Sequence, residues 1–558
     1  MGSRRFRTCP ALVVSLLILL GVGTAFASGT GETSAGTAVP KEITMFVGTP
    51  LSATIPAWDT PVGKKIQELT GVKLNVEYLV GTDVMTKANL MTASGVYPDL
   101  VYAGETAGVF IAANAFIPMD DLIAKYGVNI QKIYRPKELE MSKVQNGKIY
   151  VISNNRPSLD NLYPAAGFYM NYAVLKEAGF PVVKSLSQYG KLIKDYMAKH
   201  PKYGDADTIG FTLPTDGYRV TALQYGAARF LGGYPNDGVT AVDQETLEAQ
   251  LVKKMSVSKV FVQFLNDMWN SGCMDKETFM QKDDQYLAKI SSGRLLGIYD
   301  QRWAVINGLA ALEKSEKYER TLVAFPVVAD GVKKEYYRGP YAFAVQGVSI
   351  TTACKNSEGV FRFLDRICAD DIQKLNNWGI AGVDYSLVNG KFTRTEKQWR
   401  NSFEEDYKKS SGIEQFNFLP RYERTDDAKY GKFADGNWVN PALNQEYNNL
   451  RYKPFEKEIL QSYKVKTLCD FFAPAYPARY QPGWAARQQL PQDSVEFIAS
   501  NKALDLATEY FPKMTMASRP SQLDALWNEY QAKLNAIPGL AEYEKKITDI
   551  IKKSAQFY

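Results

Sequence analysis

The sequence predicts an α/β protein with two or more lobes. Its 558 residues are 45% apolar, which is enough to bury a large core, and a chain of this length usually divides into several domains. Residues 43–47 have the pattern of a strand, residues 60–70 that of a helix, and residues 72–78 that of a second strand. Alternating strands and helices are typical of a parallel sheet covered by helices.

Local signals support these first elements. Thr60 is placed to cap the helix and Gly71 to end it. Residues 72–78 alternate between apolar and polar side chains, the period of a half-buried strand. A second helix over residues 83–94 and a third strand over residues 98–102 continue the alternation.

The rest of the chain keeps this alternation, with one exception. Residues 392–482 are rich in Tyr, Asn, Pro and charge, and their weak periodicity predicts no fold; we assign them as an elaboration of the second lobe. Elsewhere we expect strands over residues 148–152 and 295–299, a strand-rich stretch over 321–350, and helices over 187–199, 258–269, 357–368 and 521–534.

The N-terminus predicts export. Three arginines precede an apolar run over residues 11–22, and the small-x-small motif of residues 25–27 follows it. The run is shorter than the roughly 20 apolar residues that span a bilayer. We therefore expect residues 1–27 to be a removed signal peptide and residues 28–40 a flexible leader. Ser28 stands where a lipid-anchored receptor would carry cysteine, so the mature protein is expected to be soluble in the periplasm or outside the cell.

The charge of the chain argues against one class of partner, and its cysteines leave two chemical states open. Loss of three signal-peptide arginines lowers the formal charge from +6 to +3, with acids and bases interspersed, so nucleic acid is not an expected partner. Export permits disulfides, but free thiols remain an equal alternative. The four cysteines concerned are Cys273, Cys354, Cys368 and Cys469.

Few residues have the pattern of a catalytic or metal site. His200 is the only histidine, which excludes multi-histidine metal sites, and no zinc, phosphate-loop or dinucleotide motif occurs. The pairs Asp120-Asp121 and Asp283-Asp284 offer the two carboxyls that a glycosidase needs, yet each precedes a helical pattern, where acids commonly cap helices. We expect no enzyme activity, no metal and no cofactor, with a secreted polysaccharide hydrolase as the alternative.

Aromatic residues are more informative. The chain holds 34 Tyr, 27 Phe and 8 Trp, and several lie among polar residues in predicted loops. A ring in a cleft can stack on the apolar face of a sugar, each contact contributing about 1 kcal/mol. Burial in the core is the alternative for each ring. The rings concerned are Trp58, Trp303, Tyr341, Trp378 and Trp484.

Several segments together resemble a known family. The chain is similar to the extracellular solute-binding proteins of ABC transporters, in particular the long, lipoprotein-like branch of the carbohydrate-binding group, over residues 41–558. The resemblance is carried by residues 70–72, 95–101, 116–123, 146–150, 297–303 and 378–385.

This resemblance implies a two-lobe periplasmic-binding-protein fold of type II with the ligand between the lobes. It places residues 41–153 and 304–345 in lobe 1 and residues 154–303 and 346–558 in lobe 2. The implied hinge crossings lie near Ser153, Asp300 and Val345.

The resemblance also implies a ligand site at the carboxyl ends of the strands. Acids, amides, an arginine and rings at these positions suit a polyhydroxylated ligand. The leading candidates are Glu105, Asn154, Asn155, Asp300, Arg302 and Trp303, followed by Trp58, Tyr341, Trp378 and Asp384.

We therefore expect a monomeric receptor that captures a carbohydrate, an oligosaccharide first of all, by hinge closure and delivers it to the permease subunits of an ABC importer. Two alternatives remain besides the hydrolase. The same fold can bind a peptide or another solute, or the chain can serve adhesion without a small ligand.

Overall fold

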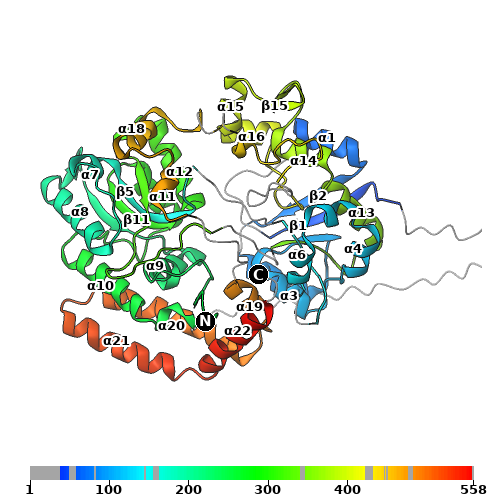
Figure 1. Cartoon of the computed structure of the whole chain (residues 1–558). Helices are drawn as coiled ribbons and strands as arrows, with labels where there is room; N and C mark the ends of the chain where they lie inside the picture. The colour runs from blue at the N-terminus through cyan, green and yellow to red at the C-terminus, as the bar shows by residue number, and fades with distance from the viewer. Residues whose placement is uncertain are drawn as a thin grey trace, which may run out of the picture.

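Two α/β lobes, each with its own sheet and hydrophobic core, make up the protein (Figure 1). The computed structural model describes residues 38–48, 58–80, 83–143, 146–154, 162–339, 346–421, 431–444, 447, 450–474 and 482–555. The expected signal peptide and most of the expected leader lie outside these residues. Across these ranges, no helix combines the length and apolar character that crossing a membrane requires.

The sheet of lobe 1 has the order β2 (Lys73–Tyr78), β1 (Glu42–Val47), β3 (Leu100–Tyr102), β13 (Gly347–Ile350), β4 (Ile152–Ser153). β1 runs parallel to β2 and β3, whereas β13 is antiparallel to β3 and β4. The parallel part confirms the predicted strand–helix–strand alternation.

Two helices of lobe 1, α1 (Pro61–Thr70) and α2 (Val84–Ser94), begin and end at the predicted residues. In α1, the Thr60 hydroxyl accepts a hydrogen bond from the Gly63 N–H at 3.2 Å, and Gly71 ends the helix with a φ of 69°. Asp83 caps α2 in the same way. The lobe also contains α3 (Ala107–Ala112), α4 (Asp120–Tyr126), α5 (Val128–Ile133), α6 (Pro136–Met141), α13 (Ser357–Ile367) and α14 (Asp370–Trp378).

The sheet of lobe 2 has the order β12 (Leu322–Phe325), β5 (Ala166–Asn171), β11 (Leu295–Gln301), β8 (Ile209–Thr212). β5 is antiparallel to both neighbours, and β8 is parallel to β11. Its helices include α7 (Tyr172–Glu177), α8 (Leu186–Lys199), α9 (Ala227–Leu231), α10 (Ser256–Asn270), α11 (Asp283–Ser291) and α12 (Arg302–Lys314), and a hairpin joins β9 (Thr240–Val242) to β10 (Ala249–Leu251).

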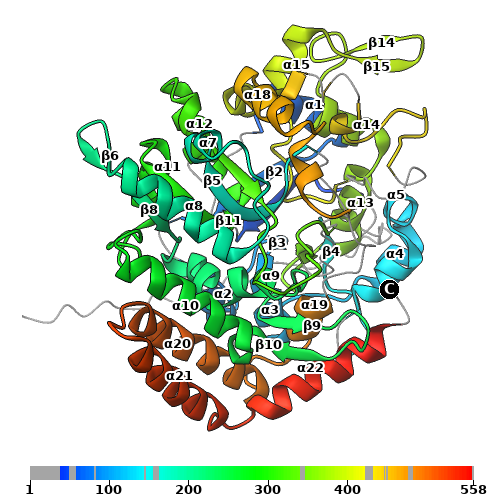
Figure 2. The same cartoon turned by 60° about the vertical axis from the view of Figure 1, so that its left-hand side comes forward.

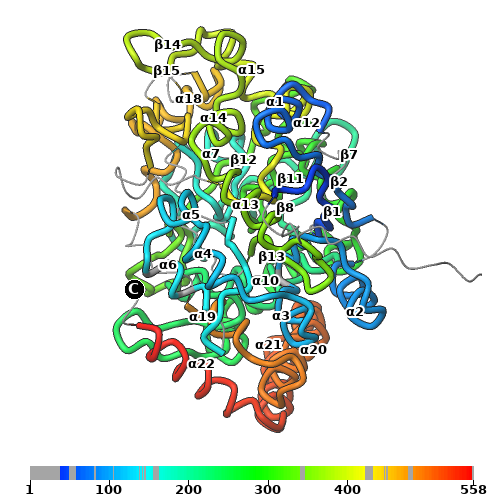
Figure 3. The backbone as a smooth tube through the Cα atoms, turned by 90° about the vertical axis from the view of Figure 1, so that its right-hand side faces the viewer, coloured from blue at the N-terminus to red at the C-terminus, as the bar shows by residue number. Residues whose placement is uncertain are grey.

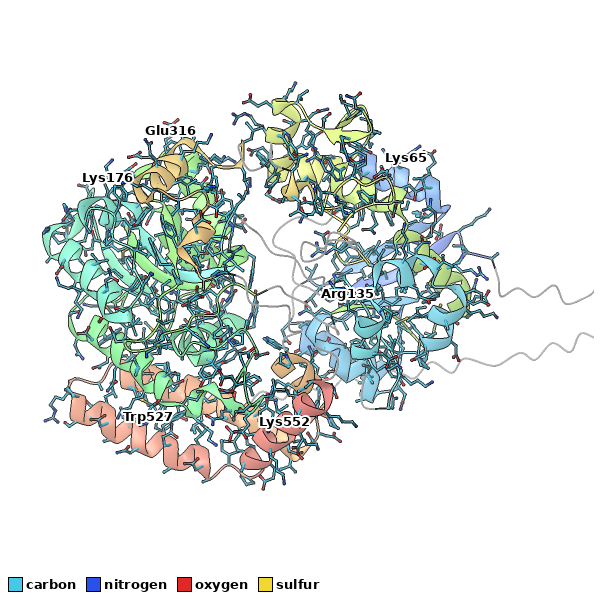
Figure 4. All side chains as sticks on the ribbon, viewed as in Figure 1. Lys65, Arg135, Lys176, Glu316, Trp527 and Lys552 are labelled. Carbon is cyan, nitrogen blue, oxygen red and sulfur yellow. The ribbon has the colours of Figure 1, made fainter. Side chains whose placement is uncertain are left out.

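The C-terminal helices form an outer layer on lobe 2, seen along the lower side in Figures 2 and 3. α20 packs against α10 and α21, and α22 against α19 and α20. Figure 4 places Trp527 on α21 and Lys552 on α22 in this layer. The layer contains α19 (Pro482–Gln488), α20 (Val495–Thr515), α21 (Pro520–Asn535) and α22 (Leu540–Ser554), whereas α18 (Pro454–Tyr463) lies apart from it in the upper part of the lobe.

The segment expected as an elaboration of lobe 2 divides between the lobes. The hairpin of β14 (Ser386–Val388) and β15 (Lys391–Thr393), with α15 (Glu396–Phe403) and α16 (Glu405–Ser411), joins the core of lobe 1. That core continues to Val439, whereas residues from Tyr452 onward contribute to the core of lobe 2.

The lobes therefore divide the chain differently from the expected boundaries. β12, expected in lobe 1, pairs with β5 in lobe 2, and β13, expected in lobe 2, pairs with β3 in lobe 1. Asp300 lies within β11, inside lobe 2, and is not a crossing. The described residues belong to lobe 1 up to Ser153, to lobe 2 from Leu162 to Tyr337, to lobe 1 from Gly347 to Val439 and to lobe 2 from Tyr452 onward. These stretches change lobe three times, and we call the changes the first, second and third crossing. Strand patterns do not encode which sheet a strand joins.

The structure decides between the two alternatives for the cysteines. Cys273, Cys354, Cys368 and Cys469 are all free thiols, and three of them are buried. Burial raises the pKa of the half-buried Cys354 thiol to about 11, which disfavours the reactive thiolate.

Candidate functional site

One edge of the lobe 2 sheet carries the best-formed site. β5 begins at Ala166, just after the first crossing, and lies opposite Gln301 at the end of β11. β8 runs parallel to β11, so the carboxyl ends of both strands meet at the edge where the chain enters from lobe 1. Ligands of open α/β sheets bind at such carboxyl edges.

Two exposed aromatic rings lie at this edge. Tyr218 follows β8 and Trp303 follows β11, and their side chains are 57% and 59% exposed. Their ring planes are inclined by only 15° with centroids 6.4 Å apart. Most large rings of this lobe are buried in its core, so this exposed and nearly parallel pair stands out as an accessible aromatic surface.

A buried charge cluster supports the pair. The guanidinium of Arg219 lies 5.8 Å from the centre of the Trp303 ring, pairs with Asp300 at 2.5 Å and donates to Asp283 at 2.9 Å. The Tyr286 hydroxyl also donates to Asp300, at 2.8 Å. Asp300 is 4% exposed, and this burial raises its pKa to about 6 although Arg219 and Tyr286 act to lower it. Asp300 therefore positions Arg219 against the Trp303 ring.

Arg302 belongs to a neighbouring cluster at the first crossing. Its guanidinium lies 3.5 Å from the centre of the Tyr163 ring, and the Tyr163 hydroxyl donates to Glu456 at 3.1 Å. Burial raises the pKa of Glu456. Because Tyr163 follows the first crossing and Glu456 follows the third, this contact ties the two crossings to lobe 2.

The facing edge of lobe 1 combines two predicted candidates with residues that the sequence did not single out. Trp58 lies 4.8 Å from Phe416, and Tyr78 meets Phe418 edge-on at 6.1 Å. Asn154 donates its side-chain amide to the carbonyl oxygen of Asn417 at 2.5 Å. The segment of residues 416–418 thus joins two predicted candidates, Trp58 and Asn154, into one wall.

Two polar atoms of this wall have no partner. Within the described ranges, neither Nε1 of Trp58 nor Oδ1 of Asn417 forms a hydrogen bond, although both are buried from solvent. An open hollow of about 560 Å³ reaches Trp58 and Tyr78 along the free edge of β2. One donor and one acceptor without partners suit a ligand that carries hydroxyl groups.

Two predicted residues lie in the interior of lobe 1 instead. Trp378 is 1% exposed and donates its indole N–H to the carbonyl oxygen of Trp438 at 2.9 Å. Asp384 is also buried, and accepts hydrogen bonds from the Ile380 N–H at 2.7 Å and the Tyr407 hydroxyl at 2.5 Å. Because their polar groups bond within the lobe, we do not retain them as ligand contacts.

The other candidates are less defined. Glu105 lies in the 3-10 turn Gly104–Thr106 directly after β3, at the carboxyl edge of lobe 1. Asn155 and Tyr341 lie outside the described residues. Asp120, Asp121, Asp283 and Asp284 occupy the first turns of α4 and α11, where their charge complements the helix dipole as expected, but the N-cap positions are Met119 and Lys282, so none of the four caps its helix.

Known proteins share this fold and sequence. The model of the family described as bacterial extracellular solute-binding protein matches residues 62–379. Lipoprotein LipO of Bacillus subtilis is 22% identical over 401 residues, which cover 70% of this chain and 76% of that protein. The fructooligosaccharide ABC transporter substrate-binding protein FusA of Streptococcus pneumoniae is 25% identical over 356 residues, covering 61% of this chain and 63%, less than two thirds, of that protein.

Solved structures agree in fold. FusA in complex with kestose superposes with a TM-score of 0.64 at 17% identity, covering 93% of this chain and 100% of that one. An HMO-binding, ABC-transporter-associated solute-binding protein of Bifidobacterium longum infantis gives 0.64 at 14% identity, covering 93% and 99%. At these identities the superpositions establish the two-lobe architecture alone.

Proposed function

Because the chain belongs to the bacterial extracellular solute-binding protein family, we propose that it is the receptor of an ABC importer and that its ligand is a carbohydrate, an oligosaccharide first of all. The exposed, nearly parallel Tyr218–Trp303 pair is the observation that carries this proposal. Exposed rings at the carboxyl edge of a sheet suit the flat apolar face of a sugar ring. The name of FusA as a fructooligosaccharide-binding protein supports the same ligand class.

The ligand is held between the two carboxyl edges. Trp303 and Tyr218 on lobe 2 supply stacking surfaces, and Trp58 and Asn417 on lobe 1 supply a donor and an acceptor without partners. A ligand that contacts both edges binds the closed arrangement better than the open one and shifts the population towards closure. Micromolar capture corresponds to about −8 kcal/mol, which several hydrogen bonds and stacked rings can supply.

The same geometry favours binding over hydrolysis. Glycoside hydrolysis needs two carboxyls that face the bond to be cleaved. Asp300 and Asp283 both pair with Arg219, and Asp300 is almost fully buried. Their role in the proposal is to hold Arg219, so the ligand leaves chemically unchanged.

The remaining parts of the proposal concern export and partners. Residues 1–27 act as a signal peptide, and the mature monomer works outside the cytoplasm. Its closed form docks on the permease subunits of the importer. Peptides and other solutes remain the alternative ligands for the same fold.

A ligand screen tests the proposal. Mature protein is assayed by thermal shift and calorimetry against oligosaccharides, monosaccharides, amino acids and peptides, because a ligand that binds only the native state raises the melting temperature. A saturable shift with one saccharide class and no released product supports the receptor. Saturable binding of peptides alone favours the alternative ligand, and new reducing ends in the saccharide samples identify a hydrolase.

A further inference from the structure

An unusual helical turn follows the segment that carries the Tyr218 ring. Tyr218 lies in the 3-10 turn Gly217–Val220. The chain then forms one π-helical turn, Ala222–Gly226, in which the Ala227 N–H donates to the carbonyl oxygen of Ala222, five residues earlier. We call this segment the π-turn. Such turns are rare, and they occur mostly as single turns at functional sites.

One side of the π-turn packs against the strand that leads to Trp303. A Cβ atom at Gly226 would lie 3.4 Å from the ring of Tyr299, so the backbone approaches this ring closely. Tyr299 belongs to β11, and Trp303 directly follows that strand in α12. The π-turn is therefore in contact with the element that places Trp303.

The π-turn is fastened to the outer layer of lobe 2 by Gln224. This side chain is 5% exposed, and its Nε2 donates to the Thr508 hydroxyl at 2.7 Å and to the carbonyl oxygen of Leu504 at 3.2 Å. Both partners lie on α20. The Thr508 hydroxyl in turn donates to the carbonyl oxygen of Leu504 at 3.1 Å. A buried amide that loses its partners is costly, so these bonds hold the π-turn against α20.

The form of the π-turn determines where the Tyr218 ring points. An α-helical turn in place of the π-turn would hold one residue fewer, and each residue of a helix turns the chain by about 100° and advances it by about 1.5 Å. The segment before the turn would rotate accordingly. Tyr218 would then leave its position at 15° to the Trp303 ring plane, with the ring centroids 6.4 Å apart.

We propose that Gln224 is a positioning residue of the ligand site. By fastening the π-turn to α20, it keeps the Tyr218 ring parallel to that of Trp303, so the outer layer of lobe 2 takes part in ligand recognition. This inference rests on the proposed function, in which the two rings bind a saccharide. The alternative is that the Gln224 amide stabilises the fold without any effect on the ring.

Hydrogen exchange of the ligand-free protein gives the first test. In Gln224→Leu, backbone amides of residues 217–227 are expected to exchange about tenfold faster than in wild type, because two hydrogen bonds are lost. Asn266→Leu is the matched control, since the buried Asn266 amide also donates to α20 and its end, at the carbonyl oxygens of Met514 and Thr515. Its exchange at residues 217–227 is expected to equal that of wild type. Unchanged exchange at residues 217–220 in Gln224→Leu overturns the proposal.

Saccharide affinity, measured by calorimetry, gives the second test. Gln224→Leu is expected to weaken binding by about tenfold, because one stacked ring contributes up to about tenfold. In a Tyr218→Ala background the same substitution is expected to have no further effect, because Gln224 acts through that ring. Affinity of Gln224→Leu within twofold of wild type contradicts the positioning role. An undiminished effect in the Tyr218→Ala background assigns Gln224 to the fold alone.

A second variant covers the case in which Gln224→Leu does not fold. Thr508 is exposed, so Thr508→Val removes the hydroxyl that Gln224 binds with little effect on the core. It is expected to weaken saccharide binding and to accelerate exchange at residues 217–227 in the same direction as Gln224→Leu. Wild-type values for both in Thr508→Val contradict the proposal. A wild-type protein that binds no saccharide contradicts the proposed function instead, and the exchange rates then decide the role of Gln224.

Discussion

Removal of the Trp303 indole tests the proposed stacking surface most sharply. Trp303 is 59% exposed, so truncation to alanine removes little packing from the core. A whole tryptophan side chain has a surface of about 250 Å²; with 59% of it exposed and divided between two ring faces, one face offers about 75 Å² to a sugar. Burial of this area contributes about 2 kcal/mol to binding, at about 25 cal/mol per Å². We therefore expect Trp303→Ala to weaken saccharide binding by about 20- to 30-fold.

Calorimetry with the saccharide identified by the screen measures this loss. Tyr318→Ala is the matched control, because Tyr318 is a 40% exposed ring that precedes β12 at the opposite edge of the same sheet. The control is expected to bind like wild type. The free energy of unfolding measured in urea is expected to change by no more than about 0.5 kcal/mol for Trp303→Ala, as for other surface positions. An affinity of Trp303→Ala within twofold of wild type refutes the stacking surface.

Further predictions concern stability. Arg219→Met leaves Asp300 buried without its cation and is expected to lower the free energy of unfolding by about 3 kcal/mol in urea titrations, against less than about 1 kcal/mol for the exposed Lys282→Met. The pKa of Asp300 is raised to about 6, so its contribution to stability is fully present below about pH 4 and is lost as the pH rises through 6. The free energy of unfolding of Asp300→Asn, measured between pH 4 and 7.5, is expected to lack this loss. A pH dependence of that free energy parallel to wild type would disprove it. Trp378→Ala is expected to cost about 3–5 kcal/mol by calorimetric unfolding while saccharide affinity stays unchanged, and reduced affinity of the folded variant would return Trp378 to the site. Because the described cysteines are free, dithiothreitol is expected to leave the unfolding midpoint unchanged; a drop would reveal a disulfide.

Local features of the fold could be predicted from the sequence. Thr60 and Gly71 bound α1 because capping and a positive φ depend on residues within one turn. The strand–helix–strand order of the first hundred residues follows from apolar periodicity in the same way. Trp303 was found because it directly follows a recognisable strand, β11.

Long-range features could not be predicted. Trp378 lies among polar neighbours in the sequence, yet Phe392 and Trp399 cover it from a segment whose weak periodicity predicted no fold. Residues 416–418 could not be predicted for the same reason, because the apolar periodicity of their segment is weak. Their contacts to Trp58 and Asn154 join positions hundreds of residues apart in the sequence. Sheet membership of β12 and β13 is equally non-local, which explains the wrong lobe boundaries.

Tyr218 shows a third limit. Tyr218 follows β8, a strand of four residues that the apolar periodicity did not predict. Its proposed role as a stacking surface depends on the position of its ring parallel to that of Trp303. A single tyrosine in a predicted loop carries no such information.

Small-angle scattering of the mature protein, titrated with the saccharide that the screen identifies, tests the central claim most directly. If the ligand is held between the lobes, the radius of gyration decreases and saturates at the same concentration as the heat of binding. Saturable binding without any compaction would mean that the ligand occupies one lobe alone, and would contradict capture by closure.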